Sequence, residues 1–146
     1  MKGSYCLIIE LKKDSKIKIG KLGYINFRKG FYVYIGSAMS SLESRIKRHL
    51  SSNKKKHWYI DYLLLNTNSQ IKEVLFNISD SKIECDLAKL IGEKEEEIMN
   101  FGSSDCKCNS HLIYFKTYEK SINSVVNSYE TLNMDFKDLN YFKKII

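Results

Sequence analysis

Tyrosine, arginine and histidine side chains recur in the first fifty residues at spacings that could bring them together. Tyr5 begins a segment rich in strand formers, Tyr34 lies in a second such segment, and Arg45 and His49 lie four residues apart in an expected helix. Residues four apart in a helix share one face. Residues 36–38, Gly-Ser-Ala, allow a tight turn between the second segment and the helix. We therefore expect the two tyrosines and Arg45 to converge on one surface.

Such a set of side chains suits the hydrolysis of a phosphodiester bond. The reaction needs a group that takes a proton from water, a cation that stabilises the added charge on phosphorus, a metal or acid for the leaving oxygen, and a groove for the polymer. Tyrosine, arginine, histidine and a carboxylate can supply the first three. The alternatives are that Tyr5 and Tyr34 only fill a core and that Arg45 is a solvated helix charge.

The positive charge of the chain is concentrated in its first part. The 146 residues carry 24 Lys and Arg against 17 Asp and Glu, a net charge of +7. Residues 1–57 hold 14 of the basic and three of the acidic residues, a net +11, which leaves −4 for residues 58–146. This excess is typical of a polyanion binder, although a Lys-rich surface that only keeps the protein soluble is the alternative. The candidate nucleic-acid contacts near Arg45 are Lys47, Arg48, Lys54, Lys55, Lys56 and His57.

Length and composition restrict the class of protein. A chain of 146 residues fits one domain, and 43% hydrophobic with 28% charged residues excludes a disordered tail, a collagen-like fibre and a membrane bundle. Apolar runs such as 63–65 and 31–35 are too short to span a membrane, and the first residues show no secretion signal. We therefore expect a cytoplasmic protein with no membrane partner. Four cysteines in a chain that can build its own core do not indicate a disulfide scaffold.

The periodicity of the apolar residues predicts a mixed α/β (α+β) protein. We expect a three-stranded antiparallel meander over residues 4–36. The other predicted strands are 71–78 and 111–116, and the predicted helices are 42–51, 55–66 and 82–92, with two weaker helical patterns in 118–146. Trp58, Tyr62 and Leu65 are expected in the core, and residues 95–97 on a solvated helix face.

The short motifs resemble those of a known family. Gly3-Ser4-Tyr5, Tyr34-Ile35-Gly36, and Arg45 with His49 resemble the GIY-YIG nuclease superfamily. The chain is also similar to a small prokaryotic branch of it, some members of which are fused to endonuclease III. The segments that carry this similarity are 19–23, 30–38, 45–49, 57–63, 84–88 and 101–112, so that it covers residues 3 to about 116.

The resemblance implies a central three-stranded antiparallel sheet flanked by helices, and cleavage of nucleic acid with a single divalent ion, Mg or Mn. Glu84 would hold the metal by its carboxylate. Tyr5 would act on the attacking water as general base or orient it, with Tyr34 beside it. Arg45 would bind the scissile phosphate and stabilise its developing charge, with His49 alongside for proton transfer or positioning.

Further positions match the pattern less directly. His57 looks like another phosphate-facing residue, and Asn109 matches the polar residue near the end of the family pattern, a place that Asn100 could fill instead. The first motif has Ser4 where the family has isoleucine, a position that concerns packing. Tyr59 stands where members of the branch often have a second histidine.

Several of these positions have other interpretations. Glu84 could be an acid placed at a helix N-terminus by the dipole, and Asp86 and Glu93 could claim the metal on the same grounds. His111 follows a loop into a strand and fits a structural histidine. The cysteine pair at 106 and 108, with His111 and Cys85, has poor zinc spacing, so structural zinc is not expected; a disulfide from Cys85 to one of the pair or free thiols are the alternatives.

The leading hypothesis is a GIY-YIG-like, divalent-metal-dependent endonuclease of DNA, active in repair or processing. The alternative is a nucleic-acid-binding module that keeps the fold without cleavage, and a third possibility is a basic face that binds an acidic protein. We divide the chain into a nuclease-like domain at 1–117 and a C-terminal helical extension at 118–146, which packs on the domain and could meet a protein partner.

Overall fold

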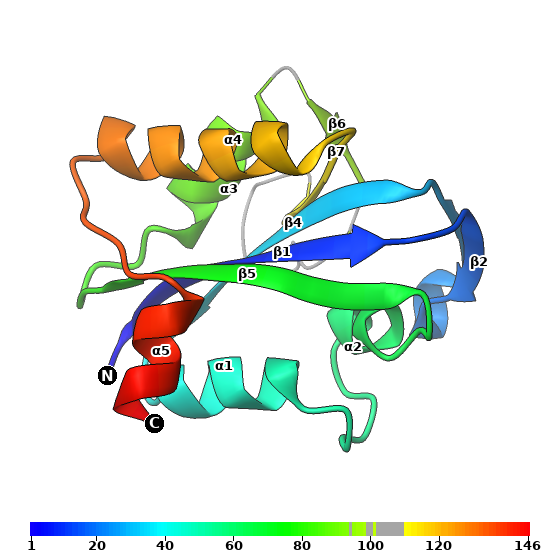
Figure 1. Ribbon diagram of the computed structural model, residues 1–146, viewed down its shortest axis with the longest axis horizontal. Helices are drawn as coiled ribbons and strands as arrows, with labels where there is room; N and C mark the ends of the chain where they lie inside the picture. Colours follow the sequence, from blue (N-terminus) through cyan, green and yellow to red (C-terminus); the bar gives the residue numbers. More distant parts are fainter. Residues whose placement is uncertain (94, 99–100, 102–109) are drawn as a thin grey trace.

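A five-stranded antiparallel sheet forms the centre of the computed structural model, which describes residues 1–93, 95–98, 101 and 110–146 (Figure 1). Its strands lie in the order β5-β1-β4-β7-β6. Their bounds are β1 Gly3–Leu11, β4 Gly30–Ala38, β5 Ser69–Ile78, β6 Glu96–Glu97 and β7 Leu112–Phe115. The expected α+β class is confirmed, but the central sheet has five strands rather than three.

Helices cover both faces of the sheet (Figure 1). Their bounds are α1 Leu42–Leu50, α2 Tyr59–Leu64, α3 Glu84–Gly92, α4 Tyr118–Thr131 and α5 Leu139–Ile145. Along β1, Leu7 and Ile9 pack in one core with residues of α1, α2 and α5, whereas Cys6 and Ile8 pack in a second core with residues of α3 and α4. Because β1 is covered on both faces, it is apolar along almost its whole length.

The expected meander over residues 4–36 is wrong. β2 (Ser15–Lys18) and β3 (Tyr24–Phe27) form a separate two-stranded antiparallel sheet, linked by a 3-10 turn, η1 (Gly20–Leu22). β1 instead pairs directly with β4, and β4 pairs on its other edge with β7. Both edges of β1 and β4 are therefore occupied by other strands of the main sheet, which leaves no edge beside them for β2.

The two helices after β4 differ in how well the sequence predicts them. α1 begins as expected, because the side chain of Ser41 accepts the N–H of Ser44 as an N-cap. The next helix is shorter than the predicted 55–66 and begins at Tyr59. Its start is set by Asp61, whose carboxylate accepts the N–H groups of the two residues that precede the helix.

The C-terminal residues contribute to both cores. Val125 and Tyr129 of α4 are buried with the residues of α3, and Phe142 of α5 is buried on the opposite face of the sheet. Both expected helical patterns after residue 118 are present. The acidic run 95–97 differs from its prediction, because Glu96 and Glu97 form the short strand β6 beside β7. Within the described ranges, no helix is both long enough and apolar enough to cross a membrane.

Candidate active site

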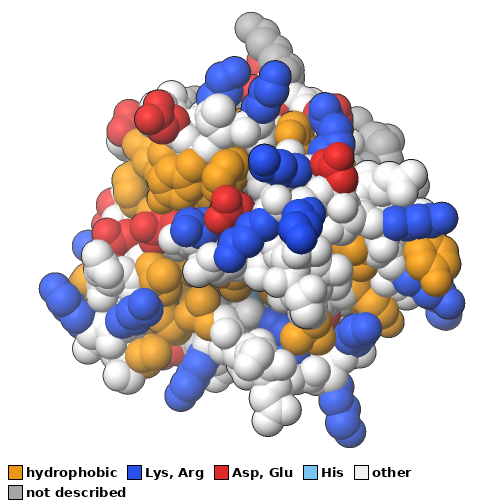
Figure 2. Space-filling model, turned by 45° about the vertical axis from the view of Figure 1, so that its right-hand side comes forward, with side chains coloured by type: hydrophobic (Ala, Val, Ile, Leu, Met, Phe, Trp, Pro, Cys, Tyr) orange, Lys and Arg blue, Asp and Glu red, His pale blue; other side chains and the backbone are white. Residues whose placement is uncertain are grey.

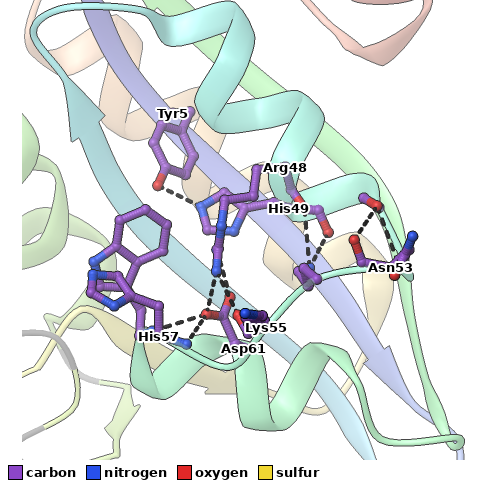
Figure 3. A network of polar contacts seen from close by, with 10 residues as sticks. Tyr5, Arg48, His49, Asn53, Lys55, His57 and Asp61 are labelled. Atoms are coloured by element: carbon purple, nitrogen blue, oxygen red, sulfur yellow. Dashed lines mark hydrogen bonds and ion pairs between the residues drawn. The ribbon is translucent and has the colours of Figure 1, made fainter.

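Three aromatic rings from β1, β4 and α1 lie together on one face of the sheet. The hydroxyl oxygen of Tyr5 lies 2.7 Å from Nε2 of His49, and Figure 3 shows the two side chains pointing at each other. The ring of Tyr34 lies 6.4 Å from that of Tyr5 and 6.0 Å from that of His49, centroid to centroid. Tyr5 and His49 are only 1% and 2% exposed. The predicted convergence of the two tyrosines with the first helix is therefore present.

Two glycines make this arrangement sterically possible. Gly36 is directly opposite Tyr5 in the β1–β4 register, and a Cβ atom there would lie 2.5 Å from the Tyr5 phenol. Only glycine lets the ring lie across the neighbouring strand. A Cβ atom at Gly3 would lie 1.8 Å from the carbonyl oxygen of Asn77 in β5. The glycines of both short motifs thus leave room for close packing, Gly36 for the Tyr5 ring and Gly3 for the backbone of β5.

Burial keeps these three side chains neutral. Burial and the nearby Tyr34 raise the pKa of Tyr5 far above its ordinary value, although the charge and hydrogen bond of Arg45 oppose the shift. Burial and the charge of Glu84 raise the pKa of Tyr34 to about 12. Burial and the positive charge of Lys54 lower the pKa of His49 to about 3. At neutral pH, His49 is therefore a neutral imidazole with one donor and one acceptor nitrogen.

Arg45 lies beside this cluster on an aromatic support. Its Nη1 donates to the carbonyl oxygen of Ser37 at 3.1 Å, and its guanidinium carbon lies 4.6 Å from the centroid of the Trp58 ring. The guanidinium carbon of Arg48 lies 4.4 Å from the same centroid. Trp58 and Tyr62, expected in the core, are half-buried and pack against it, and Trp58 also contacts both arginines. Leu65, also expected in the core, is half-buried.

Arg48, a candidate nucleic-acid contact, has internal partners. Its guanidinium donates to both carboxylate oxygens of Asp61 at 2.9 Å each, and to the carbonyl oxygen of Lys55 at 2.9 Å (Figure 3). The Asp61 side chain is fully buried. This bidentate pair ties the loop between α1 and α2 to helix α1. Sequence reasoning missed Asp61, although an acid three residues after Trp58 has the spacing of a helix N-terminal cap.

The lysines of the same region divide into two groups. Lys54 donates through Nζ to the carbonyl oxygen of His49 at 2.7 Å, so that it caps the end of α1. Lys47, Lys55, Lys56 and His57 have exposed side chains. Their role as nucleic-acid contacts remains a prediction, as it does for Arg48 and Lys54.

Glu84 reaches this end of β4 from the opposite layer of the fold. It is the first residue of α3, and its Oε1 accepts a hydrogen bond from the Ser37 hydroxyl at 2.8 Å. Ser37 thus joins Glu84, through its hydroxyl, to Arg45, through its carbonyl. The other carboxylate oxygen of Glu84 lies 3.7 Å from Nδ1 of the buried His111. Ser37 was not a candidate in the sequence, where it appeared only as part of a turn.

Glu84 is the carboxylate of this site that could take part in holding a divalent ion. Mg²⁺ is commonly bound by one or two carboxylates and substrate phosphates while it keeps several waters. The Glu84 carboxylate is 15% exposed and accepts from the Ser37 hydroxyl, but Lys82 Nζ lies 3.7 Å from the same Oε1 atom, so an ion bound there would have to take the place of this ammonium. Among the residues that the structure describes, no group of three or more His, Cys, Asp or Glu could hold a metal ion. Four positions weighed in the sequence, Asn100, Cys106, Cys108 and Asn109, lie outside the described residues.

The chain is thus a mixed α/β protein in which a buried Tyr–His pair lies beside an arginine, and Ser37 connects that arginine to a glutamate. Residues 4–134 match the family described as "Domain of unknown function DUF123", and the chain belongs to that family. No curated protein and no solved structure matches the chain.

Acid is expected to destabilise the protein through His49. The pKa of histidine is ordinarily 6.5, whereas burial lowers that of His49 to about 3. Between these values the unfolded chain binds a proton that the folded protein excludes, so stability falls as the pH falls from about 6.5 towards 3. The slope for one such group is at most about 1.4 kcal/mol per pH unit.

Urea titrations of the wild type and His49→Gln at pH 7, 6 and 5 measure this effect. We expect the difference in stability between the two proteins to narrow as the pH falls. Tyr5→Phe is the matched control, because it removes the partner hydroxyl but keeps the buried imidazole and should follow the pH dependence of the wild type. A His49→Gln difference that is independent of pH would contradict the prediction.

Proposed function

We propose that the protein is a GIY-YIG-type endonuclease that hydrolyses phosphodiester bonds in DNA with the help of a divalent ion. The observation that carries the proposal is the 2.7 Å contact between the Tyr5 hydroxyl and His49 Nε2, with Arg45 on the same helix as His49. A structural tyrosine in a core needs neither a neutral imidazole nor an adjacent guanidinium.

The Tyr5–His49 pair can move a proton without forming a buried phenolate. The raised pKa of Tyr5 makes a free phenolate costly, but the neutral imidazole of His49 can accept the phenolic proton. As water attacks phosphorus, its proton passes to the oxygen of Tyr5 while the proton of Tyr5 passes to Nε2 of His49. The negative charge that develops on the phosphate favours the protonated imidazole and raises the pKa of His49 in the transition state.

Arg45 supplies the positive charge for that phosphate. A guanidinium has five N–H donors, of which the Ser37 carbonyl and Tyr5 use only part. The contact with Trp58 holds the planar group in place, and a held cation stabilises developing charge without reorganisation. Glu84 and the Ser37 hydroxyl would hold the divalent ion. When bound, the ion supplies stabilisation of the leaving oxygen.

The exposed lysines of the loop after α1 suit the phosphate backbone on either side of the cut. Lys55, Lys56 and His57 are exposed and precede Trp58, so that they lead directly to the support of Arg45. The second candidate function is a nucleic-acid-binding module without cleavage. It is favoured by the near-complete burial of Tyr5 and His49, which also fits a cluster kept only for packing.

A cleavage assay separates the two functions. The protein is incubated with supercoiled plasmid, branched DNA and single strands in Mg²⁺, in Mn²⁺ and in EDTA. We expect cutting that EDTA abolishes and that Glu84→Gln reduces at least a hundredfold, because the variant keeps the shape of the side chain but loses the metal-binding charge. Glu119→Gln, which changes an exposed glutamate in the first turn of α4, is the matched control and should cut like the wild type. Salt-sensitive binding with no cutting in any metal would leave only the binding module.

A further inference from the structure

The small β2–β3 sheet has an outer face that packs against nothing else in the described structure. In its register Lys16 is opposite Asn26, Ile17 opposite Ile25, and Lys18 opposite Tyr24. Ile17 is buried and Ile25 half-buried towards the core, whereas the side chains of the other two pairs are exposed. Tyr24 is 65% exposed, more than any other large hydrophobic side chain that the structure describes.

The outer face carries Lys16 and Lys18, and the residues that precede and connect its strands are also basic. Residues 12–26 contain five lysines and one acid, Asp14. The ammonium nitrogen of Lys16 lies 5.3 Å from the centroid of the Tyr24 ring. In Figure 2, Lys and Arg side chains border an exposed hydrophobic group at the right-hand edge, whereas most of the acidic side chains lie to the left and at the top.

The turn between β2 and β3 adjoins the helix that follows the lysine-rich loop. The 3-10 turn η1 lies against α2, because a Cβ atom at Gly20 would be 3.4 Å from the Tyr59 ring and 3.4 Å from the Tyr62 hydroxyl. The ammonium nitrogen of Lys56 lies 5.0 Å from the centroid of the same Tyr62 ring. The turn between β2 and β3 and Lys56, in the loop before Trp58, therefore both lie beside Tyr62.

We infer that the outer face of the β2–β3 ribbon binds an unpaired nucleic-acid strand, with Tyr24 stacked on a base and Lys16 and Lys18 on the adjacent phosphates. The inference rests on the proposed function, since it supplies the same site with a strand to cut. A flat exposed ring among lysines is the arrangement by which proteins hold single strands. In a duplex, neighbouring base pairs cover the faces of the bases, so a ring on this surface finds a stacking partner only where the strand is unpaired.

Binding is measured by fluorescence anisotropy with a labelled oligothymidine and with a blunt duplex of the same length, in EDTA to prevent cutting. We expect Tyr24→Ala to weaken single-strand binding about tenfold and duplex binding by less than twofold. The double variant Lys16→Gln/Lys18→Gln should also weaken single-strand binding. The slope of its log binding constant against log salt concentration should be shallower than that of the wild type by about 1.4.

Two variants on other surfaces are the matched controls. Lys116→Gln/Lys120→Gln removes the same charge at exposed positions at the start of α4. Tyr141→Ala removes another exposed tyrosine, in α5, whose ring also lies near a lysine, with Lys137 Nζ 5.2 Å from its centroid. Both should bind within twofold of the wild type.

The outcomes separate this inference from the proposed function. Unchanged single-strand binding by Tyr24→Ala, equal losses in the control variants, or a preference for the duplex would each overturn the ribbon site, even if the wild type cuts DNA. Weakened binding by Tyr24→Ala together with no cutting by the wild type would support the ribbon site and refute the endonuclease.

Discussion

Arg45→Ala is expected to reduce DNA cleavage at least a hundredfold while the protein remains folded. Removing one preorganised donor from a developing anion commonly costs a factor of about 10² to 10³ in rate. Arg45 is half-buried and donates hydrogen bonds to the Ser37 carbonyl and to Tyr5, so its loss removes two polar contacts but little apolar packing. The measurement is the rate of plasmid nicking at saturating DNA, together with a thermal melt.

Arg45→Lys tests the planar geometry of the group. Lysine keeps the charge but not the fork or the stack on Trp58, so we expect it to recover only part of the rate. Arg28→Ala removes the same side chain at an exposed position near the other end of β4, where Arg28 pairs with Glu96, and should cut within a few fold of the wild type. Cleavage by Arg45→Ala at the rate of the wild type would remove Arg45 from the mechanism.

The sequence patterns predicted where the strands lie along the chain better than they predicted which strands pair with one another. The segment Lys16-Ile17-Lys18-Ile19 alternates as a half-exposed strand should, and Ser15–Lys18 does form a strand. The alternation specifies which side chains face inward, but the same pattern fits a third strand of a meander and a separate ribbon. β2 does not join the main sheet because both edges of β4 are already paired, one with β1 and the other with β7, which begins at Leu112. That pairing depends on residues about eighty positions away.

Part of the candidate site was predictable although its residues are far apart in the sequence. Tyr5, Tyr34 and His49 meet because two strands pair and the helix after the second strand packs on them. The different surroundings of Arg45 and Arg48 were not predictable. The two arginines are one helix turn apart and contact the same tryptophan, but Arg48 pairs with the buried carboxylate of Asp61 in the next helix, whereas Arg45 donates to the carbonyl of Ser37.

The ion pair of Arg48 with Asp61 helps to position Arg45. Arg48 holds the α1–α2 loop through Asp61, and that loop carries Trp58, on which Arg45 rests. The position of Arg45 therefore depends on an ion pair that it does not touch. Damage to this pair is expected to lower both the stability of the fold and the order of the site.

Asp61→Asn is expected to destabilise the protein by about 3 kcal/mol, the cost typical of breaking a buried ion pair by removing one partner. The carboxylate is fully buried and accepts four hydrogen bonds, two from Arg48 and two from the amides of His57 and Trp58. An asparagine amide turns one acceptor into a donor that faces other donors. In a chain of this size the loss corresponds to a fall in Tm of roughly 10 °C.

The pH dependence of stability identifies the carboxylate as the source of this effect. Burial raises the pKa of Asp61, but the hydrogen bonds from Arg48 and the two amides outweigh it and lower the pKa to about 2, from an ordinary 3.8. The stabilisation is thus complete above about pH 4 and is lost as the pH falls towards 2, because only the unfolded chain takes up the proton between those values. Asp61→Asn should lack this part of the acid transition.

A double-mutant cycle completes the test. Arg48→Met alone should also be destabilising, because it leaves the buried carboxylate unpaired, whereas Asp61→Asn/Arg48→Met should lose less than the sum of the single losses. Glu130→Gln, which removes one exposed carboxylate from α4, is the control and should change stability by less than about 0.5 kcal/mol. Strictly additive losses in the cycle would show that the pair does not act as a unit. The loop that carries Trp58 would then be held by the amide hydrogen bonds to Asp61 alone, and cleavage by Arg48→Met should remain close to that of the wild type.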